Sequence, residues 1–99
     1  MAARDHGVYA ISVAAAMVSM EIQNLRVYER RGLLTPDRTA GGTRLYSVDD
    51  VERLERIRDL LAEGLNLAGI ARVLELEDEV DRLRARLGDD GDGRSEESA

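Results

Sequence analysis

Apolar residues near the start of the chain recur three and four positions apart, with polar residues between them. This spacing predicts a first helix over about residues 13–18, with an inward stripe of Ile11, Ala14, Ala15 and Val18. After a break at Ser19 and Met20, a second helix is predicted over Glu21–Arg31, and Gly32 ends it. Two helices joined by so tight a break are typical of a helix-turn-helix.

The second predicted helix has two different faces. Its inward stripe is apolar and consists of Ile22, Leu25 and Tyr28. A neighbouring face has the same helical spacing but is mainly polar and basic, and it consists of Gln23, Arg26, Val27 and Arg30. The second helix of a DNA-binding helix-turn-helix lies in the major groove, so this face is the one expected to meet DNA.

A different pattern follows the second helix. Two short segments, Leu33–Thr35 and Arg44–Tyr46, flank a stretch rich in turn residues that contains Gly41 and Gly42. This arrangement predicts a β-hairpin with a glycine tip. A hairpin directly after a helix-turn-helix is a wing, which we place at Leu33–Tyr46.

Two further helices are predicted after the hairpin. Residues 47–50 (SVDD) form a capping box with aspartate in place of the usual glutamate, and this starts a third helix. Gly64 ends this helix, and its predicted inward residues are Val51, Leu54, Ile57 and Leu61. Asn66 caps a fourth helix, whose first apolar residues are Leu67, Ile70 and either Val73 or Leu74.

The fourth helix continues with the spacing of a coiled-coil seam. Its apolar residues alternate three and four positions apart, at Val73, Leu76, Val80, Leu83 and Leu87. Two heptads are a short repeat for a coiled coil. The alternative interpretation is therefore an ordinary helix that packs on its own domain. The residues between the seam positions are nearly all charged, so we predict a dimerisation helix over residues 73–87 and a homodimer.

The predicted fold is mainly α: a winged helix-turn-helix with a β-hairpin wing and a short C-terminal coiled-coil helix. We expect a flexible N-terminus at 1–8, a DNA-binding domain at 9–72, the dimerisation helix at 73–87 and a disordered acidic tail at 88–99. The apolar stretch over residues 7–20 is shorter than the ~20 residues that a membrane span needs. We therefore expect a cytoplasmic protein with no membrane partner.

Composition argues against several classes of function. The chain has no cysteine and one histidine, His6, which excludes disulfides, thiolate zinc sites and iron–sulfur clusters, so we expect no metal and no cofactor. His6 has no evident partner for acid–base or nucleophilic chemistry. Gly41 and Gly42 lack the lysine of a phosphate-binding loop. We predict no catalytic residue and no enzyme.

Charge is unevenly distributed along the chain. The net charge is −6, and every basic residue is an arginine. Residues 22–46 hold five arginines against Glu29 and Asp37, a local charge of +3, whereas residues 88–99 have a local charge of −4. Phosphate responds to charge within a Debye length of about 8–10 Å, so the local basic region matters more than the total.

Six residues of the second helix and the wing are candidates for DNA contacts. Glutamine pairs with adenine and arginine with guanine in the major groove, while arginine and tyrosine side chains also bind phosphates. The candidates are Gln23 for base readout, Arg26 and Arg30 for guanine or phosphate, Arg38 and Arg44 for the backbone or minor groove, and Tyr46 for phosphate. Any single arginine has the alternative of being a solvated surface charge, but five on two adjacent elements favour DNA.

From Tyr9 to about Leu87 the sequence resembles the MerR family of winged-helix transcriptional regulators. The residues that carry the resemblance are Leu25-Arg26, Tyr28-Glu29, Gly32–Leu34, Pro36, Arg38-Thr39, Gly42, Arg44, Tyr46-Ser47, Asp50-Val51, Leu54, Ile57-Arg58, Gly64 and Ile70. Within the family the chain is most similar to the HspR-type heat-shock repressors, through Ile11–Ala15, Met20, Gln23, Arg38-Thr39, Gly41-Gly42 and Asn66–Ile70.

The resemblance implies a homodimeric repressor of the stress response that binds an inverted repeat in double-stranded DNA. It places Arg26 of the second helix in DNA contact and Arg44 and Tyr46 on phosphate. It also implies an Hsp70-type chaperone as co-repressor, and no small-molecule effector is expected, because no ligand-binding domain follows the dimerisation helix. The chain departs from the family at Val27, where an aromatic is frequent, in a less basic wing, and in lacking the cysteines of the metal-sensing branch.

Two other functions fit parts of the same pattern. An architectural or excision-type protein of the same fold would coat and bend DNA, which a broad footprint would reveal. An acidic protein-interaction module would use the acidic helix and tail, and would not bind DNA even at low salt. The sequence-specific regulator remains the leading hypothesis.

Overall fold

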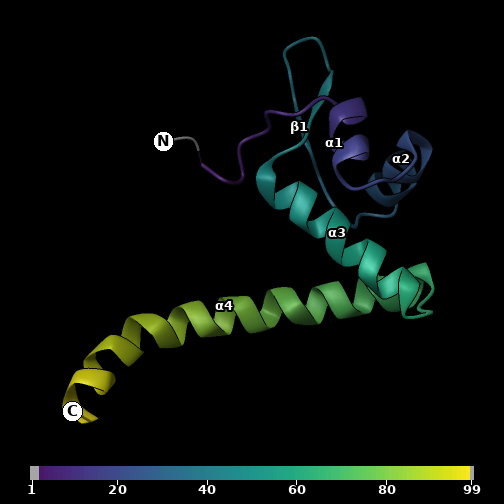
Figure 1. Cartoon of the computed structure of the whole chain (residues 1–99). Coiled ribbons are helices and arrows are strands. Elements are labelled where there is room, and N and C mark those ends of the chain that lie inside the picture. Colours follow the sequence, from purple (N-terminus) through teal and green to yellow (C-terminus); the bar gives the residue numbers. More distant parts are fainter. Residues whose placement is uncertain (1–2, 99) are drawn as a thin grey trace. The chain divides into compact units, whose positions relative to one another are not determined.

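The first part of the computed structural model is a helix-turn-helix (Figure 1). The structure describes residues 3–98, with side chains for 3–88. Helices α1 (Ile11–Met17) and α2 (Ile22–Arg30) pack together, and Ser19 in the turn between them has a φ of 55°. The buried side chains of these elements are Ala14, Ala15, Val18, Leu25 and Tyr28. The helix-turn-helix predicted from the periodicity is therefore confirmed.

The wing is a short antiparallel hairpin that follows α2. Strand β1 (Asp37–Arg38) pairs with β2 (Arg44–Leu45), with Arg38 opposite Arg44. The tip is closed by hydrogen bonds from Thr39 N to Thr43 O (2.8 Å) and from Gly42 N to Thr39 O (2.9 Å). The hairpin is confirmed, but its first strand begins later than predicted.

Helix α3 (Val48–Ala62) starts at the predicted capping box. The Ser47 hydroxyl accepts from Asp50 N at 3.0 Å, and the Asp50 carboxylate accepts from Ser47 N at 2.9 Å. The inward residues are Val51, Leu54, Ile57 and Leu60. Leu60 takes the place predicted for Leu61, which is 38% exposed. Leu60 lies three positions after Ile57 and Leu61 four, so either could continue the stripe. In the structure the core is packed around Leu60.

Two arginines of α3 attach it to the helix-turn-helix. Arg58 Nη1 donates to the carbonyl oxygen of Val18, just after α1, at 2.9 Å. Arg53 Nε donates to the carbonyl oxygen of Leu33, just after α2, at 2.6 Å. The Val18 carbonyl is at the C-cap of α1, where helix carbonyls have no intrahelical partner, and the Leu33 carbonyl lies in the segment that follows α2. The arginines therefore hold α1 and α2 on α3 at their C-terminal ends.

The N-terminal segment is attached to the wing and to α3, whereas the sequence predicted a flexible segment. Tyr9 and Tyr46 form an antiparallel bridge, with N···O distances of 2.9 and 2.7 Å. Arg4 pairs with Asp49 and Glu52 in the first turns of α3. A Cβ at Gly7 would overlap the carbonyl oxygen of Leu45. The absence of a side chain at this position allows the close approach, which the local sequence pattern does not reveal.

Helix α4 (Leu67–Ser98) forms a second unit; it starts directly after Asn66, where the sequence predicted a fourth helix, and it contains the predicted dimerisation segment 73–87. Its backbone is helical over residues 88–98, for which the composition predicted a disordered acidic tail. Ile70 and Leu74 are buried. Among the described residues, no helix has the length and apolar character needed to cross a membrane.

Candidate nucleic-acid interface

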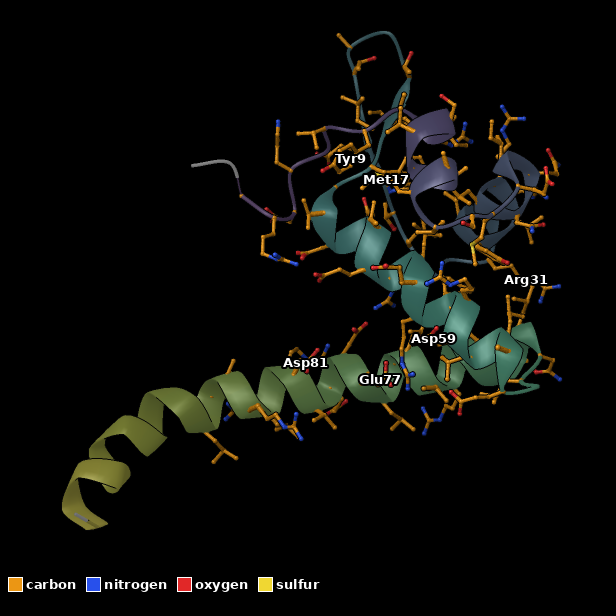
Figure 2. The ribbon with its side chains drawn as sticks, viewed as in Figure 1. Tyr9, Met17, Arg31, Asp59, Glu77 and Asp81 are labelled. Atoms are coloured by element: carbon orange, nitrogen blue, oxygen red, sulfur yellow. The ribbon has the colours of Figure 1, made fainter. Side chains whose placement is uncertain are left out.

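The outer face of α2 carries the polar residues predicted to meet DNA. Leu25 and Tyr28 are buried, which orients the helix with Gln23, Arg26 and Arg30 exposed. These three residues lie at i, i+3 and i+7, on one side of the helix. Arg31 is also exposed and is labelled just beyond the end of α2 in Figure 2. The structure therefore brings together one glutamine and several arginines on a single exposed surface.

The two wing arginines lie directly opposite each other and share one acidic partner. Arg38 Nη2 donates to Glu29 Oε2 at 2.9 Å, and Arg44 Nε donates to Glu29 Oε1. The pairing with Glu29 raises the pKa of Arg44, so its guanidinium is firmly charged. Arg38 Nη1 also donates to the carbonyl oxygen of Gly42 at 2.9 Å. Arg38 and Arg44 thus both lie on the wing, as predicted. Each is already paired with Glu29.

Glu29 is the residue of this surface that sequence reasoning missed. The local charge count included it only as a negative charge opposed to the arginines. Its two partners are 9 and 15 residues away along the chain. No helical or strand period connects such positions, so the contact depends on how the hairpin folds back on α2. An acidic residue within a strongly basic segment was the only available signal.

Tyr46 differs from its predicted place on the surface. The residue is 0% exposed, and its hydroxyl is buried with no hydrogen-bond partner among the described residues. Burial raises the pKa of Tyr46, with a smaller contribution from the carboxylate of Glu29. The bridge to Tyr9 brings the N-terminal segment beside this end of the wing. In this conformation Tyr46 belongs to the core, and its hydroxyl is not presented to a phosphate.

We expect Tyr46→Phe to stabilise the protein. An unpartnered buried hydroxyl costs about 1–3 kcal/mol, and phenylalanine removes it while keeping the ring. Because the pKa of Tyr46 is raised, wild-type stability falls as the pH rises past the unfolded value of about 10, and the variant loses this component of the pH dependence. Urea unfolding at pH 7 and pH 10.5 measures both effects. Lower stability of the variant at pH 7 would show that the hydroxyl has a partner in solution.

Comparison with known proteins identifies the family to which this helix-turn-helix and wing belong. The family described as "MerR HTH family regulatory protein" matches residues 9–77, which is more than half of the chain. The chain belongs to the MerR family. Helices α1 and α2, the wing and α3 all lie within the matched range.

Two curated relatives place this MerR-family chain among transcriptional regulators. A heat shock protein HspR of Streptomyces coelicolor is 50% identical over 86 residues, which cover 86% of this chain and 57% of the relative. The HTH-type transcriptional regulator GlnR of Bacillus anthracis is 39% identical over 71 residues, covering 72% and 55%. The chain thus spans less than two thirds of the length of both relatives.

Solved structures agree with this assignment. One match is HiNmlR, a MerR-family regulator that lacks the sensor domain and was solved bound to promoter DNA. It superposes with a TM-score of 0.67 at 28% identity, and the match covers 81% of this chain and 62% of that one. PbrR691 of Ralstonia metallidurans, solved with lead(II), gives a TM-score of 0.67 at 28% identity and covers 90% and 76%. The winged helix-turn-helix architecture is therefore that of the family.

Proposed function

We propose that this protein is a sequence-specific DNA-binding transcriptional regulator, a repressor of HspR type, and that it has no catalytic activity. The observation that carries the proposal is the exposed Gln23–Arg26–Arg30 face of α2, next to a wing with two arginines, in a chain of the MerR family. Gln23 would select bases, and the arginines would bind guanine or phosphate. As the resemblance to the HspR-type repressors implies, we also propose an Hsp70-type chaperone as co-repressor and no small-molecule effector.

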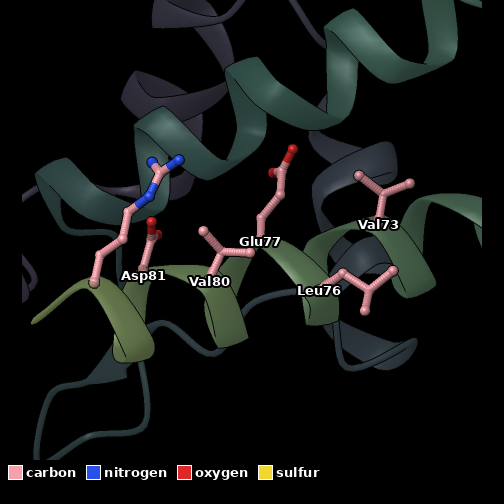
Figure 3. Close-up of a pocket in the computed structure, with 6 residues that line it drawn as sticks. Val73, Leu76, Glu77, Val80 and Asp81 are labelled. Carbon is pink, nitrogen blue, oxygen red and sulfur yellow. The ribbon is translucent and has the colours of Figure 1, made fainter. Parts of the chain in front are cut away.

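The proposed regulator acts as a homodimer through α4. Four seam side chains are 42–55% exposed in the single chain, namely Leu76, Val80, Leu83 and Leu87. Figure 3 shows Val73, Leu76 and Val80 along α4. Together with the charged residues Glu77, Asp81 and Arg84, they line a hollow of about 470 Å³. So regular an exposed apolar stripe is typical of a surface that a second helix covers. A two-fold pair of chains would then match an inverted repeat.

The charges along α4 favour an antiparallel pair. The first half of the seam region holds the acidic residues Glu75, Glu77, Asp78, Glu79 and Asp81, and the second half holds Arg82, Arg84 and Arg86. A parallel pair would place like charges beside each other. An antiparallel pair centred near Val80 places the acidic half of one helix beside the basic half of the other, and flanking charges of this kind set orientation in coiled coils.

Selection of bound fragments from sheared genomic DNA at physiological salt tests the proposed function. We expect enrichment of one inverted repeat. Gln23→Ala is expected to relax selectivity, and Arg26→Ala to weaken binding to the selected repeat by about 10-fold or more. Equal retention of all fragments would contradict sequence-specific regulation and indicate an architectural protein. Retention of none, even at low salt and with an Hsp70-type chaperone added, would contradict DNA binding.

A further inference from the structure

The wing is short, and contacts from outside the hairpin hold it: the N-terminal segment binds it through the Tyr9–Tyr46 bridge and Gly7 N to Asp37 Oδ2, and α2 binds it through Glu29. Strands β1 and β2 have two residues each, and an isolated two-stranded hairpin is at best marginally stable in water. At the level of side chains, the wing is attached to α2 by the carboxylate of Glu29, which binds Arg38 and Arg44 at the same time. Arg38 also holds the carbonyl of Gly42 near the tip. Glu29 therefore connects α2 to both strands of the hairpin.

The position of Glu29 on α2 gives this connection a functional consequence. Glu29 lies three residues after Arg26 and immediately before Arg30, in the last turn of the helix proposed to enter the major groove. The side chain of Glu29 is only 18% exposed, so its ion pairs are partly shielded from water. The wing is thus held in a fixed relation to the base-reading face before DNA binds, and such preorganisation favours binding.

Glu29 also reduces the attraction of the wing for arbitrary DNA. Non-specific binding depends almost wholly on cations that neutralise phosphates. A phosphate that approaches the wing must compete with the Glu29 carboxylate for the two guanidinium groups. On a cognate site the seated α2 supplies additional base contacts, whereas on other sequences it does not.

We propose that Glu29 is a positioning residue that fixes the wing against α2 and thereby increases the discrimination between cognate and non-cognate DNA. The inference rests on the proposed DNA-binding function. In this role Glu29 contacts neither a base nor a phosphate, and it acts only through the position of the wing.

Glu29→Gln tests this role, because glutamine keeps the size of the side chain but loses the charge that binds two guanidinium groups. We expect binding to a random duplex to strengthen and binding to the selected repeat to weaken, so that the ratio of the two affinities falls by about 10-fold. Without DNA, the Arg44 Nε–H signal in ¹H–¹⁵N NMR spectra is expected to exchange slowly with water in the wild type and rapidly in the variant.

Glu55→Gln is the matched control. Glu55 is exposed on α3, and its substitution changes the net charge by the same amount without touching the wing. We expect it to leave both the affinity ratio and the Arg44 signal unchanged.

Three outcomes would overturn the proposed role. If the wild type is selective and Glu29→Gln has the same ratio of cognate to random-duplex affinity, the role of Glu29 is overturned but the proposed function is not. A parallel loss of affinity for both duplexes would also overturn it, because it would show general destabilisation. Equal binding of all sequences by the wild type would overturn the proposed function, and with it the role of Glu29 in discriminating cognate from non-cognate DNA.

Discussion

Leu83→Glu is expected to lower the affinity for the selected inverted repeat by about 100-fold or more, because linked binding at two half-sites contributes a factor of roughly 10²–10⁴. Leu83 lies on the exposed apolar stripe of α4 and is 47% exposed in the single chain. A carboxylate at this position would enter the seam between two copies and lose its water there without a partner. Fluorescence anisotropy with the full repeat measures the affinity, and sedimentation measures the dimer.

Ala85→Glu is the control for this prediction. Ala85 is an exposed residue of the same helix, lies outside the 3-4 stripe, and receives the same charge. We expect it to leave both dimer formation and DNA affinity close to wild type. Normal dimer formation by Leu83→Glu would show that the stripe does not pair two copies. Loss of the dimer with full DNA affinity would show that one chain is sufficient.

Leu54→Ala is expected to lower the free energy of unfolding by about 2–5 kcal/mol, the range for removing a buried leucine side chain. Leu54 is 0% exposed in the middle of α3, between the buried residues Val51 and Ile57. A loss of this size is a large part of the roughly 5–15 kcal/mol that stabilises a typical domain. Urea unfolding followed by circular dichroism measures it, in the presence and absence of the selected repeat.

Leu61→Ala provides the comparison on the same helix. Leu61 is 38% exposed, so we expect less than about 1 kcal/mol of destabilisation from the same change of side chain. Equal effects of the two substitutions would contradict the inward face of α3 as the structure places it.

Elements with local signals could be predicted from the sequence. The stripe of α1, the turn before α2 and the capping box at Ser47 each depend on residues within a few positions of one another. The exposed residues Gln23, Arg26 and Arg30 of the candidate interface were found in the same way, because burying Leu25 and Tyr28 determines which face of α2 is outward. Helical period and capping chemistry were sufficient for these features.

Three features that sequence reasoning missed depend on tertiary contacts. The burial of Tyr46 follows from its bridge to Tyr9, which is 37 positions earlier in the chain. The first strand starts at Asp37 instead of Leu33, because Leu33 and Leu34 are used as buried core residues. The pairing of Glu29 with the wing requires the hairpin to fold back on α2. None of these contacts has a periodic signal.

The Glu29 bridge also has a consequence for the timing of DNA binding. Charges at the rim of an interface mainly change association rates, whereas contacts that become desolvated mainly change dissociation rates. Arg26 and Arg30 are exposed, and their positive charge acts on an approaching duplex from the beginning. Arg38 and Arg44 are already paired with Glu29, so their attraction for an approaching phosphate is partly cancelled. The exposed arginines of the recognition helix would thus speed the first encounter with DNA, whereas the wing, whose charge Glu29 partly cancels, would contribute little to that rate.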